Sequence, residues 1–428
     1  ENLMKNYAEL KKISINNIVA LIFALRAISF VWLAFASSIY MPSYAMLVKI
    51  IRYSTIPIGI GYIGFNRIVE RKNLFFVLPV IYYWLMLVVN TYGGYYGSYI
   101  QEIISICCFL LMDKEEKIRI FKYFYVIIQI CNVISLILFA CYIINLPIFN
   151  VVPFYNDGIQ TSYYHQFGIW AVMGDRLYSL PRLCSIFNEP GGLGTVCGLL
   201  FAATYPYSNK KEKILLILTT ICSFSMAGYI IILLSLALYL WNKSYKYTIF
   251  IIGIIAFFIM IPKIDWGNEF LNSFAQRFEI TSSGIAGNDR TSSDFDVLYK
   301  NVLKSENIIW GMGANYTEGM GTASIKASIV QFGIVGFGIY GILWGLTVLK
   351  ASKFNKNCLI LAIVFSIAIL QRPVTLTNSY GYVLLFGAIP CLLKLDENND
   401  YLEDGTLRKI DGIRRKNSVW KNIKVKII

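Results

Sequence analysis

A cation, a carboxylate, a proline and several glycines follow one another between Arg182 and Gly194, in the sequence RLCSIFNEPGGLG. The stretch joins a long polar loop to an apolar segment. A carboxylate such as Glu189 costs about 2.5–3.5 kcal/mol or more at mid-depth in a membrane, so we expect it to have a role. Pro190 suits the first turn of a helix, and Glu189 just before it suits the positive end of the helix dipole. A helix cap and a catalytic or binding carboxylate are both open interpretations.

The polar loop at about 149–189 carries further candidates for binding an anion. They are Arg176, Arg182 and the only histidine of the chain, His165. Arginine presents five donors in a rigid fork that matches phosphate oxygens. A lone histidine among tyrosines is more often structural than a catalytic base, and we keep His165 only as a substrate-binding candidate.

A second polar loop, at about 263–323, contains the same kinds of residues. It holds Arg277, Arg290 and the glycines of WGMGAN, Gly311 and Gly313. One arginine from each loop could clamp a diphosphate, and the alternative for each is contact with lipid headgroups or loop carboxylates. The glycine motifs lack the strand–turn–helix context of a nucleotide loop, which favours turns and helix packing.

An acidic D-x-D pattern, Asp294 and Asp296, also lies in the second loop. Some metal-dependent sugar transferases use this pattern, but it is short, and nearby Asp289 does not complete a convincing set of ligands. The prediction is therefore that the protein has no metal site.

The composition is that of a polytopic membrane protein. Of the 428 residues, 57% are hydrophobic and 15% charged, against roughly 45–50% apolar and 25% charged in soluble domains. The net charge of +14 is explained by basic cytoplasmic turns and anionic lipid or substrate rather than by nucleic acid. The nine cysteines have no metal-ligand spacing and are interpreted as small buried hydrophobes.

Repeated apolar runs predict an all-α fold with about twelve transmembrane helices. The predicted spans are about 15–37, 42–65, 74–90, 100–112, 123–148, 190–205, two within 214–240, 247–262, 324–348, 358–371 and 376–393. Basic turns on both sides of 214–240 require a helical hairpin there, with a break at CSFSMAG, residues 222–228. This topology places both termini in the cytoplasm, both long loops outside, and a charged cytoplasmic tail at 396–428 after a transmembrane domain at 1–395.

Four ionisable residues fall within or near the predicted spans, and span one also carries Arg26. They are Lys49, Arg52, Glu102 and Arg372. They could pair with one another, extend to the interface, or line a path for lipid.

The layout resembles that of bacterial O-antigen and capsular polysaccharide polymerases (the Wzy family) and of the related O-antigen ligases. The shared pattern has many spans, a large outer loop ending in R-x-x-S-x-F-x-E-P-x-x-x-G, and a second loop with an arginine and G-x-G before a glycine-rich span. The matching residues are Arg182, Ser185, Phe187, Glu189, Pro190 and Gly194, then Arg290, Gly311, Gly313 and residues 324–341.

The resemblance implies a membrane glycosyltransferase of the GT-C type. Its substrates would be polyprenyl-diphosphate-linked oligosaccharides, donor and acceptor, at the outer face of the bacterial cytoplasmic membrane. It implies no cofactor and no metal. A flippase and a chain-length regulator are candidate protein partners.

One position departs from the ligases, which carry a histidine shortly before the glycine-rich span. This chain has Thr322 and Ser324 there. The departure favours a polymerase over a ligase, and it leaves the general base unidentified. Ser324 is kept as a substrate-binding candidate.

The resulting hypothesis is that an acceptor hydroxyl attacks the anomeric carbon of the donor and that polyprenyl diphosphate leaves. Arg182 and Arg290 hold the diphosphate, with Arg176 and Arg277 as weaker candidates. Glu189 either positions Arg182 or accepts the proton, and we favour positioning because a nearby cation lowers the pKa of a carboxylate. The alternatives are a ligase-type transferase, a flippase for lipid-linked oligosaccharides, and a non-enzymatic assembly partner.

Overall fold

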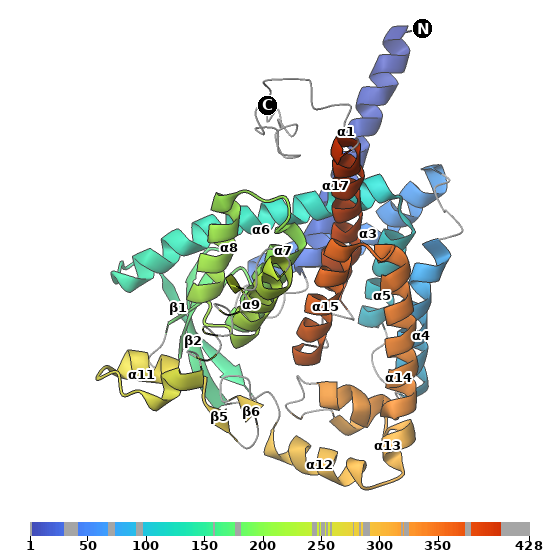
Figure 1. Cartoon of the computed structure of the whole chain (residues 1–428). Helices are drawn as coiled ribbons and strands as arrows, with labels where there is room; N and C mark the ends of the chain where they lie inside the picture. Colours follow the sequence, from blue (N-terminus) through green and yellow to red (C-terminus); the bar gives the residue numbers. More distant parts are fainter. Residues whose placement is uncertain are drawn as a thin grey trace.

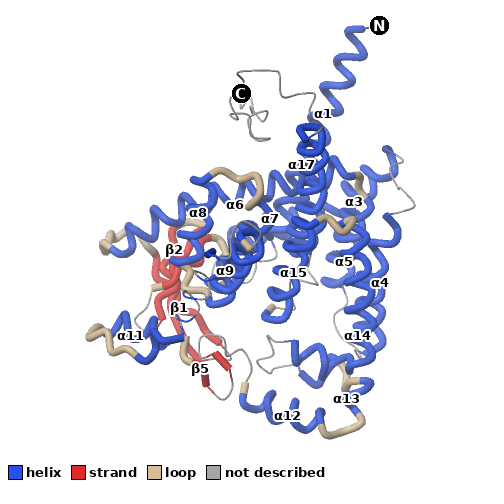
Figure 2. Tube along the Cα trace, viewed as in Figure 1, coloured by secondary structure: helices blue, strands red, loops and turns tan. Residues whose placement is uncertain are grey.

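The chain folds mainly into helices, with an antiparallel sheet against them (Figures 1 and 2). The structure is a computed structural model. It describes residues 2–29, 42–66, 73–90, 97–156, 159–175, 181–241, 259–276, 278–281, 284–285, 292–317, 325–372 and 378–403, with isolated positions between 246 and 256 and at 320.

Helices occupy most of the predicted spans. They are α1 (Asn2–Ser29), α3 (Pro42–Asn66), α4 (Leu74–Asn90), α5 (Gly97–Leu111), α6 (Lys114–Ile143), α7 (Pro190–Thr204), α8 (Lys210–Cys222), α9 (Met226–Leu240), α14 (Ile325–Ser352), α15 (Lys356–Gln371), α16 (Ser379–Tyr382) and α17 (Ala388–Glu403). A π-helical turn, Val383–Gly387, joins α16 to α17. Half of the predicted span at 247–262 lies outside the described residues.

The predicted hairpin within 214–240 is confirmed. Helix α8 ends at Cys222 and α9 begins at Met226, so the break falls inside the predicted stretch. Ser225 caps α9 by accepting a hydrogen bond from the Gly228 N–H at 3.3 Å. Serine is a favoured cap because its hydroxyl replaces a missing helical partner, which explains why the apolar run breaks here.

The charged stretch at 113–122, between the predicted spans 100–112 and 123–148, is the beginning of α6. Asp113 is the N-cap, and its carboxylate accepts from the Glu116 N–H at 2.7 Å. Glu115 and Glu116 occupy the first turn, where acidic side chains interact well with the helix dipole. In Figure 1, α6 runs across the molecule from the side of α3 to the sheet.

Three helices among the described residues are long and apolar enough to cross a membrane, rather than about twelve. They contain the stretches Met46–Phe65, Lys114–Ile143 and Ile325–Ser352. Other apolar helices are shorter, such as α7 with 15 residues and α15 with 16. At about 1.5 Å per residue these two measure roughly 22–24 Å, against a hydrocarbon core of about 30 Å.

The first polar loop is largely an antiparallel sheet, which the sequence analysis did not predict. Its strands are β1 (Asn150–Asn156), β2 (Ile159–Phe167), β3 (Trp170–Asp175) and β4 (Arg182–Ser185), in the order β1-β2-β3-β4. One face packs on α6, where Val172 and Leu183 lie beside Leu138. Figure 2 shows the strands beside the helices.

The second polar loop contains short elements. They are α11 (Glu269–Gln276), β5 (Ile280–Thr281), β6 (Gly284–Ile285), α12 (Ser293–Leu303), α13 (Asn307–Trp310) and the 3₁₀ turn Ala314–Thr317. Phe295 and Val302 of α12 are buried against Ala327 and Val330 of α14. This apolar cluster attaches the second polar loop to α14, the helix that follows it.

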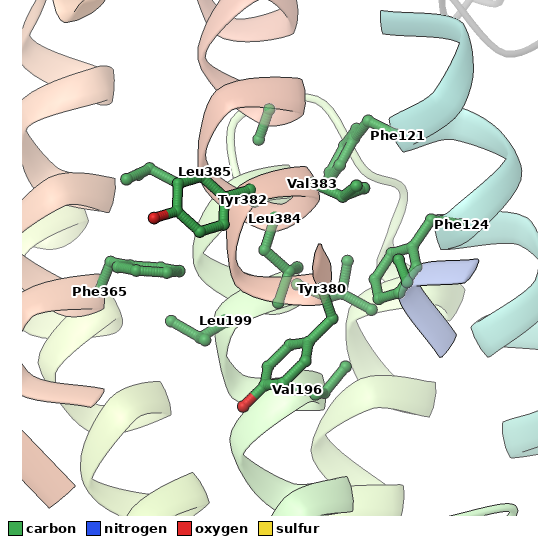
Figure 3. Close-up of a cluster of buried hydrophobic side chains, with 14 of the residues drawn as sticks. Phe121, Phe124, Val196, Leu199, Phe365, Tyr380, Tyr382, Val383, Leu384 and Leu385 are labelled. Atoms are coloured by element: carbon green, nitrogen blue, oxygen red, sulfur yellow. The ribbon is translucent and has the colours of Figure 1, made fainter. Parts of the chain in front are cut away.

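Helix α7 is at the centre of the packing. All fifteen of its residues are buried, as expected for a helix that is apolar on every side. In Figure 3, Val196 and Leu199 lie among Phe365 of α15, Tyr382 of α16 and Leu384 of the π-helical turn. The stretch singled out in the sequence therefore leads directly into the core.

Replacement of Gly194 by alanine tests this packing. A Cβ at Gly194 would meet the Ser225 side chain and lie 2.7 Å from the Ser223 Oγ. We expect Gly194→Ala to lower the free energy of unfolding by about 1–3 kcal/mol, because the α8–α9 turn has no room to move away. Thermal unfolding of the purified protein in detergent measures the change.

Gly341→Ala is the matched control. Gly341 is an exposed helical glycine with nothing within 4 Å of the added Cβ. Alanine there should be neutral or stabilise by up to about 1 kcal/mol. Equal unfolding temperatures for the two variants would contradict the proposed tight contact.

Candidate functional site

The stretch from Arg182 to Gly194 lies where several elements meet. It includes β4, the turn after it and the beginning of α7, and it contacts the α8–α9 turn and the end of α15. The elements come from distant parts of the chain. The site is therefore created by tertiary packing rather than by one local motif.

Arg182 extends from β4 toward the α8–α9 turn. Its Nε donates to the carbonyl of Ser223 at 3.3 Å, and its side chain is half-buried. The same turn packs on Gly194, so the beginning and end of the predicted stretch contact one loop. This contact orients the guanidinium at the N-terminal end of α7.

Glu189 occupies the N-cap position of α7, and Pro190 follows it at the first helical position, as the sequence predicted. The Glu189 side chain makes no capping hydrogen bond. Its Oε1 instead pairs with Nη1 of Arg372, the residue that ends α15. Arg372 is 6% exposed and the Glu189 side chain 45%, so a half-exposed carboxylate covers a buried cation.

Arg372 was expected near a membrane span but not in the site. The available signal was an arginine followed by Pro373 at the end of an apolar run. That signal does not reveal a partner 183 residues away. Positioning of Arg182 by Glu189 stays a prediction, whereas Glu189 does pair with Arg372.

Cys184 lies on β4 between these charges and is fully buried. Burial raises the pKa of its thiol to about 12, Arg182 acts to lower this pKa, and Glu189 acts to raise it. Arg182 and Glu189 are thus both close enough to influence the same atom. A pKa in this range keeps the thiol protonated at neutral pH.

Two hydrogen bonds hold the turn between β4 and α7. The Tyr164 hydroxyl donates to the carbonyl of Asn188. Ser135 of α6 donates to the Ser185 hydroxyl at 2.6 Å, and Ser185 adopts a left-handed backbone with φ of 58°. Sequence reasoning did not select Tyr164 or Ser135, because neither stands in a recognisable motif.

His165 lies on the opposite face of the sheet from Arg182. It pairs with Val172, whereas Arg182 pairs with Met173, the next residue of β3. Successive strand residues point to opposite faces. The His165 ring contacts the Tyr142 ring of α6 at 4.7 Å, which favours the structural role and separates His165 from the arginine.

Gly313 connects the second loop to α14 through its backbone. Its N–H donates to the Gln331 carbonyl at 3.1 Å, and Gly311 and Gly333 pack backbone to backbone. Gly311 and Gly313 have φ of 81° and 95°, and Gly333, with φ of 68°, divides α14 at a kink. Positive φ favours glycine, which accounts for the G-x-G pattern.

Four other predicted site residues lie outside the described residues. They are Arg176, Arg277, Arg290 and Ser324. That these residues approach Arg182 stays a prediction. That Gly313 contacts the substrate also stays a prediction.

The acidic pattern of the second loop lies at the beginning of α12. Asp296 pairs with Lys326 at 3.1 Å, and Asp294 is exposed. Within the part of the chain that the structure describes, no three potential metal-ligating side chains gather.

The ionisable residues of the predicted spans adopt different arrangements. Glu102 pairs with Arg26, and Arg372 pairs with Glu189, so each has a partner outside the four residues that were expected to pair with one another. Arg52 is buried, and its Nε donates to the Ser29 hydroxyl at 3.3 Å. Lys49 is exposed on α3.

Comparison with known protein families, with curated proteins and with solved structures finds no match for the chain. The resemblance to the polymerases is therefore neither supported nor opposed by these comparisons.

The Glu189–Arg372 pair predicts an asymmetric response to substitution. Glu189→Gln removes an acidic partner of a buried cation, and we expect a loss of about 1–3 kcal/mol in the free energy of unfolding. Arg372→Gln leaves a half-exposed carboxylate that water can solvate, so its loss should be smaller. Thermal unfolding of both single variants and the double variant measures the coupling.

Glu306→Gln, at an exposed glutamate before α13, is the control for that series and should be neutral. Equal losses in the free energy of unfolding for Glu189→Gln and Arg372→Gln would show that the different burial of the two side chains does not determine the response.

The environment of His165 predicts a pH effect on stability. Burial lowers the pKa of His165 in the folded protein, whereas a histidine in an unfolded chain titrates at about pH 6.5. Below about pH 6.5 the folded protein binds fewer protons at this side chain than the unfolded chain does. The contribution of neutral His165 to the free energy of unfolding is therefore present above about pH 6.5 and is lost as the pH falls toward the folded pKa.

Unfolding temperatures at about pH 7.5 and pH 5.5 test this effect. The wild type should lose more stability over this interval than His165→Gln. Because His165 is the only histidine, the difference between the two proteins isolates its titration. Parallel pH profiles would contradict the expectation.

Proposed function

We propose that the protein is a membrane glycosyltransferase that polymerises polyprenyl-diphosphate-linked oligosaccharide units. The observation that supports it best is the arrangement of Arg182, Glu189 and Arg372 at the N-terminal end of α7. Among the described residues, two guanidinium groups and one carboxylate meet there, so positive groups outnumber negative ones. The positive end of the α7 dipole adds positive charge.

This charge suits a reaction in which a diphosphate leaves. When the acceptor hydroxyl attacks the anomeric carbon, the glycosidic C–O bond to the diphosphate breaks and negative charge grows on the departing oxygens. Donors fixed in advance around that charge stabilise the transition state. Bidentate guanidinium groups match diphosphate oxygens, so the reaction needs no metal in this proposal.

The proposed roles extend the sequence hypothesis by one residue. Arg182 and Arg290 hold the diphosphate, and Arg372 contributes a third cation. Glu189 positions Arg372, and its pairing with a cation makes it a poor base. His165 is not assigned as the base, because it lies on the other face of the sheet.

The proposal includes about twelve spans in a GT-C-type arrangement, with both termini in the cytoplasm. The sheet and α12 then lie on the outer side. The shorter apolar helices would need tilting, local thinning of the bilayer or extension by flanking residues, each at a modest energetic cost. The long apolar helices are consistent with association with a membrane.

A flippase for the same lipid-linked sugars is the second candidate. The observation that favours it is the buried Arg26–Glu102 pair between α1 and α5, since transporters place charged side chains inside their helical bundles. A flippase would move labelled lipid-linked sugar across a bilayer without lengthening it.

Chain lengthening by the purified protein in nanodiscs tests the proposal. The substrate is a lipid-diphosphate-linked repeat unit with EDTA present, and a ladder of longer glycans is expected. Arg182→Ala, Arg290→Ala and Arg372→Ala should each lower the rate by about 100-fold or more, as for loss of one donor to a developing oxyanion.

Lys211→Ala, which removes an exposed charge from the first turn of α8, should retain the rate. Wild-type rates in all three arginine variants would refute the diphosphate clamp. If folded protein gives no ladder with verified substrate, the ligase is tested with other acceptors, and then the flippase.

A further inference from the structure

One face of α14 carries exposed apolar side chains. After the kink at Gly333 they recur every three or four residues, which is the spacing of a single helical face. They are Val335, Ile339, Ile342, Leu346 and Leu349. Tyr340 and Trp344, between them in sequence, are instead buried in the same apolar cluster as α7. An exposed apolar face of this extent indicates contact with lipid or with another protein.

The part of α14 beyond its kink has the length of a membrane crossing. It runs from Gly333 to Ser352, which at about 1.5 Å per residue is roughly 28 Å, against about 30 Å for a hydrocarbon core. Lys350 lies near the far end, with its ammonium group 4.1 Å from the centre of the Phe75 ring. A lysine at the end of a helix can extend to the lipid headgroups. The kink therefore stands where the helix would leave the hydrocarbon.

Backbone contacts fix the end of α13 at this kink. The Met312 N–H donates to the Val330 carbonyl at 2.7 Å. A Cβ at Gly333 would meet the backbone of Ile309 and Gly311, so the two chain segments touch there. The depth of α13 relative to α14 is thus set by the backbone and does not depend on flexible side chains.

The exposed side chains near this kink are of the types found at a membrane surface. In Figure 1, α12 and α13 lie at the lower end of α14. Trp310 of α13 is 70% exposed and Ile309 is 45% exposed, and Tyr316 in the next turn is exposed as well. Trp and Tyr gather where a membrane meets water, because one end of the ring is apolar and the other end forms hydrogen bonds. Lipid is therefore the occupant that fits this surface.

We propose that Ile309 and Trp310 insert into the outer interface of the bilayer and contact the lipid glycerol groups and the first carbons of the acyl chains. The exposed face from Val335 to Leu349 then contacts acyl chains deeper in the membrane. Lipid is favoured over a second protein because this face belongs to a helix segment of bilayer length and has a tryptophan at its outer limit. The orientation, with α13 on the outer side, rests on the proposed function.

This contact would hold the second polar loop at the level of the lipid headgroups. Helix α12 is attached to α14 through Phe295 and Val330, and α14 is attached to α13 at the kink. The charged side chains of the loop therefore remain near the membrane surface. In the proposed polymerase the diphosphate of each substrate lies at this level, which is where Arg290 is predicted to act.

Fluorine NMR of the full-length protein in nanodiscs tests the contact. The eight tryptophans are replaced by 5-fluorotryptophan, and the signal missing from Trp310→Phe is assigned to Trp310. A lipid that is spin-labelled next to its carbonyl group should abolish this signal by paramagnetic relaxation. A lipid labelled at the end of its acyl chain and a soluble gadolinium chelate should each broaden the signal less.

Trp344 is the matched control, and its signal is assigned with Trp344→Phe. Its side chain is 7% exposed and packs against Phe365 and Tyr382. It also lies about three helical turns beyond the kink. The lipid labelled at its carbonyl group should therefore broaden the Trp344 signal less than the Trp310 signal. Trp310→Tyr provides the same assignment if Trp310→Phe does not fold, as judged by size-exclusion chromatography.

Two results would overturn the lipid contact. If the soluble chelate broadens the Trp310 signal most, α13 lies in water. If all three probes leave the signal unchanged, a second protein covers the surface. Chain lengthening measured in the same discs separates this inference from the proposed function. A glycan ladder without lipid contact refutes only the insertion of Trp310, and lipid contact without a ladder refutes only the polymerase.

Discussion

A charged side chain inside an apolar helical bundle must be paired, and this constraint joins segments that are far apart in the sequence. Arg26 and Glu102 are 76 residues apart, and Glu189 and Arg372 are 183 apart. In each pair the arginine is almost completely buried. Loss of one partner leaves a charge in a medium that solvates it poorly, which is why such pairs restrict how the helices can be arranged.

Close packing around α7 provides the second constraint. The helix has glycines at Gly194 and Gly198, where a Cβ would meet Ser225 and Ile231 of the neighbouring hairpin. The backbone of α7 therefore approaches α9 closely, and the α8–α9 turn is brought within reach of Arg182. The close packing of α7 on the hairpin thus also places the Ser223 carbonyl that orients Arg182.

Local features of the structure could be predicted from the sequence, whereas the partners of charged residues could not. Pro190 indicated where α7 begins, and the basic turns indicated the hairpin of α8 and α9. The sheet was missed because tyrosine-rich alternation in a polar loop is a weak signal. Arg372 was missed as a site residue because an ion pair between remote helices depends on tertiary packing, which has no periodic pattern in the sequence.

The segment between Arg372 and Ser379 connects these observations. One end is held by Glu189 at the beginning of α7, and the other end by Glu102 near the beginning of α5. Both glutamates lie at the edge of apolar helices, and each contacts a buried arginine from another helix. Arg372 and Ser379 are only seven residues apart, and each is held by a carboxylate from a different helix. The two glutamates therefore fix both ends of the connection between α15 and α16, which a single ion pair could not do.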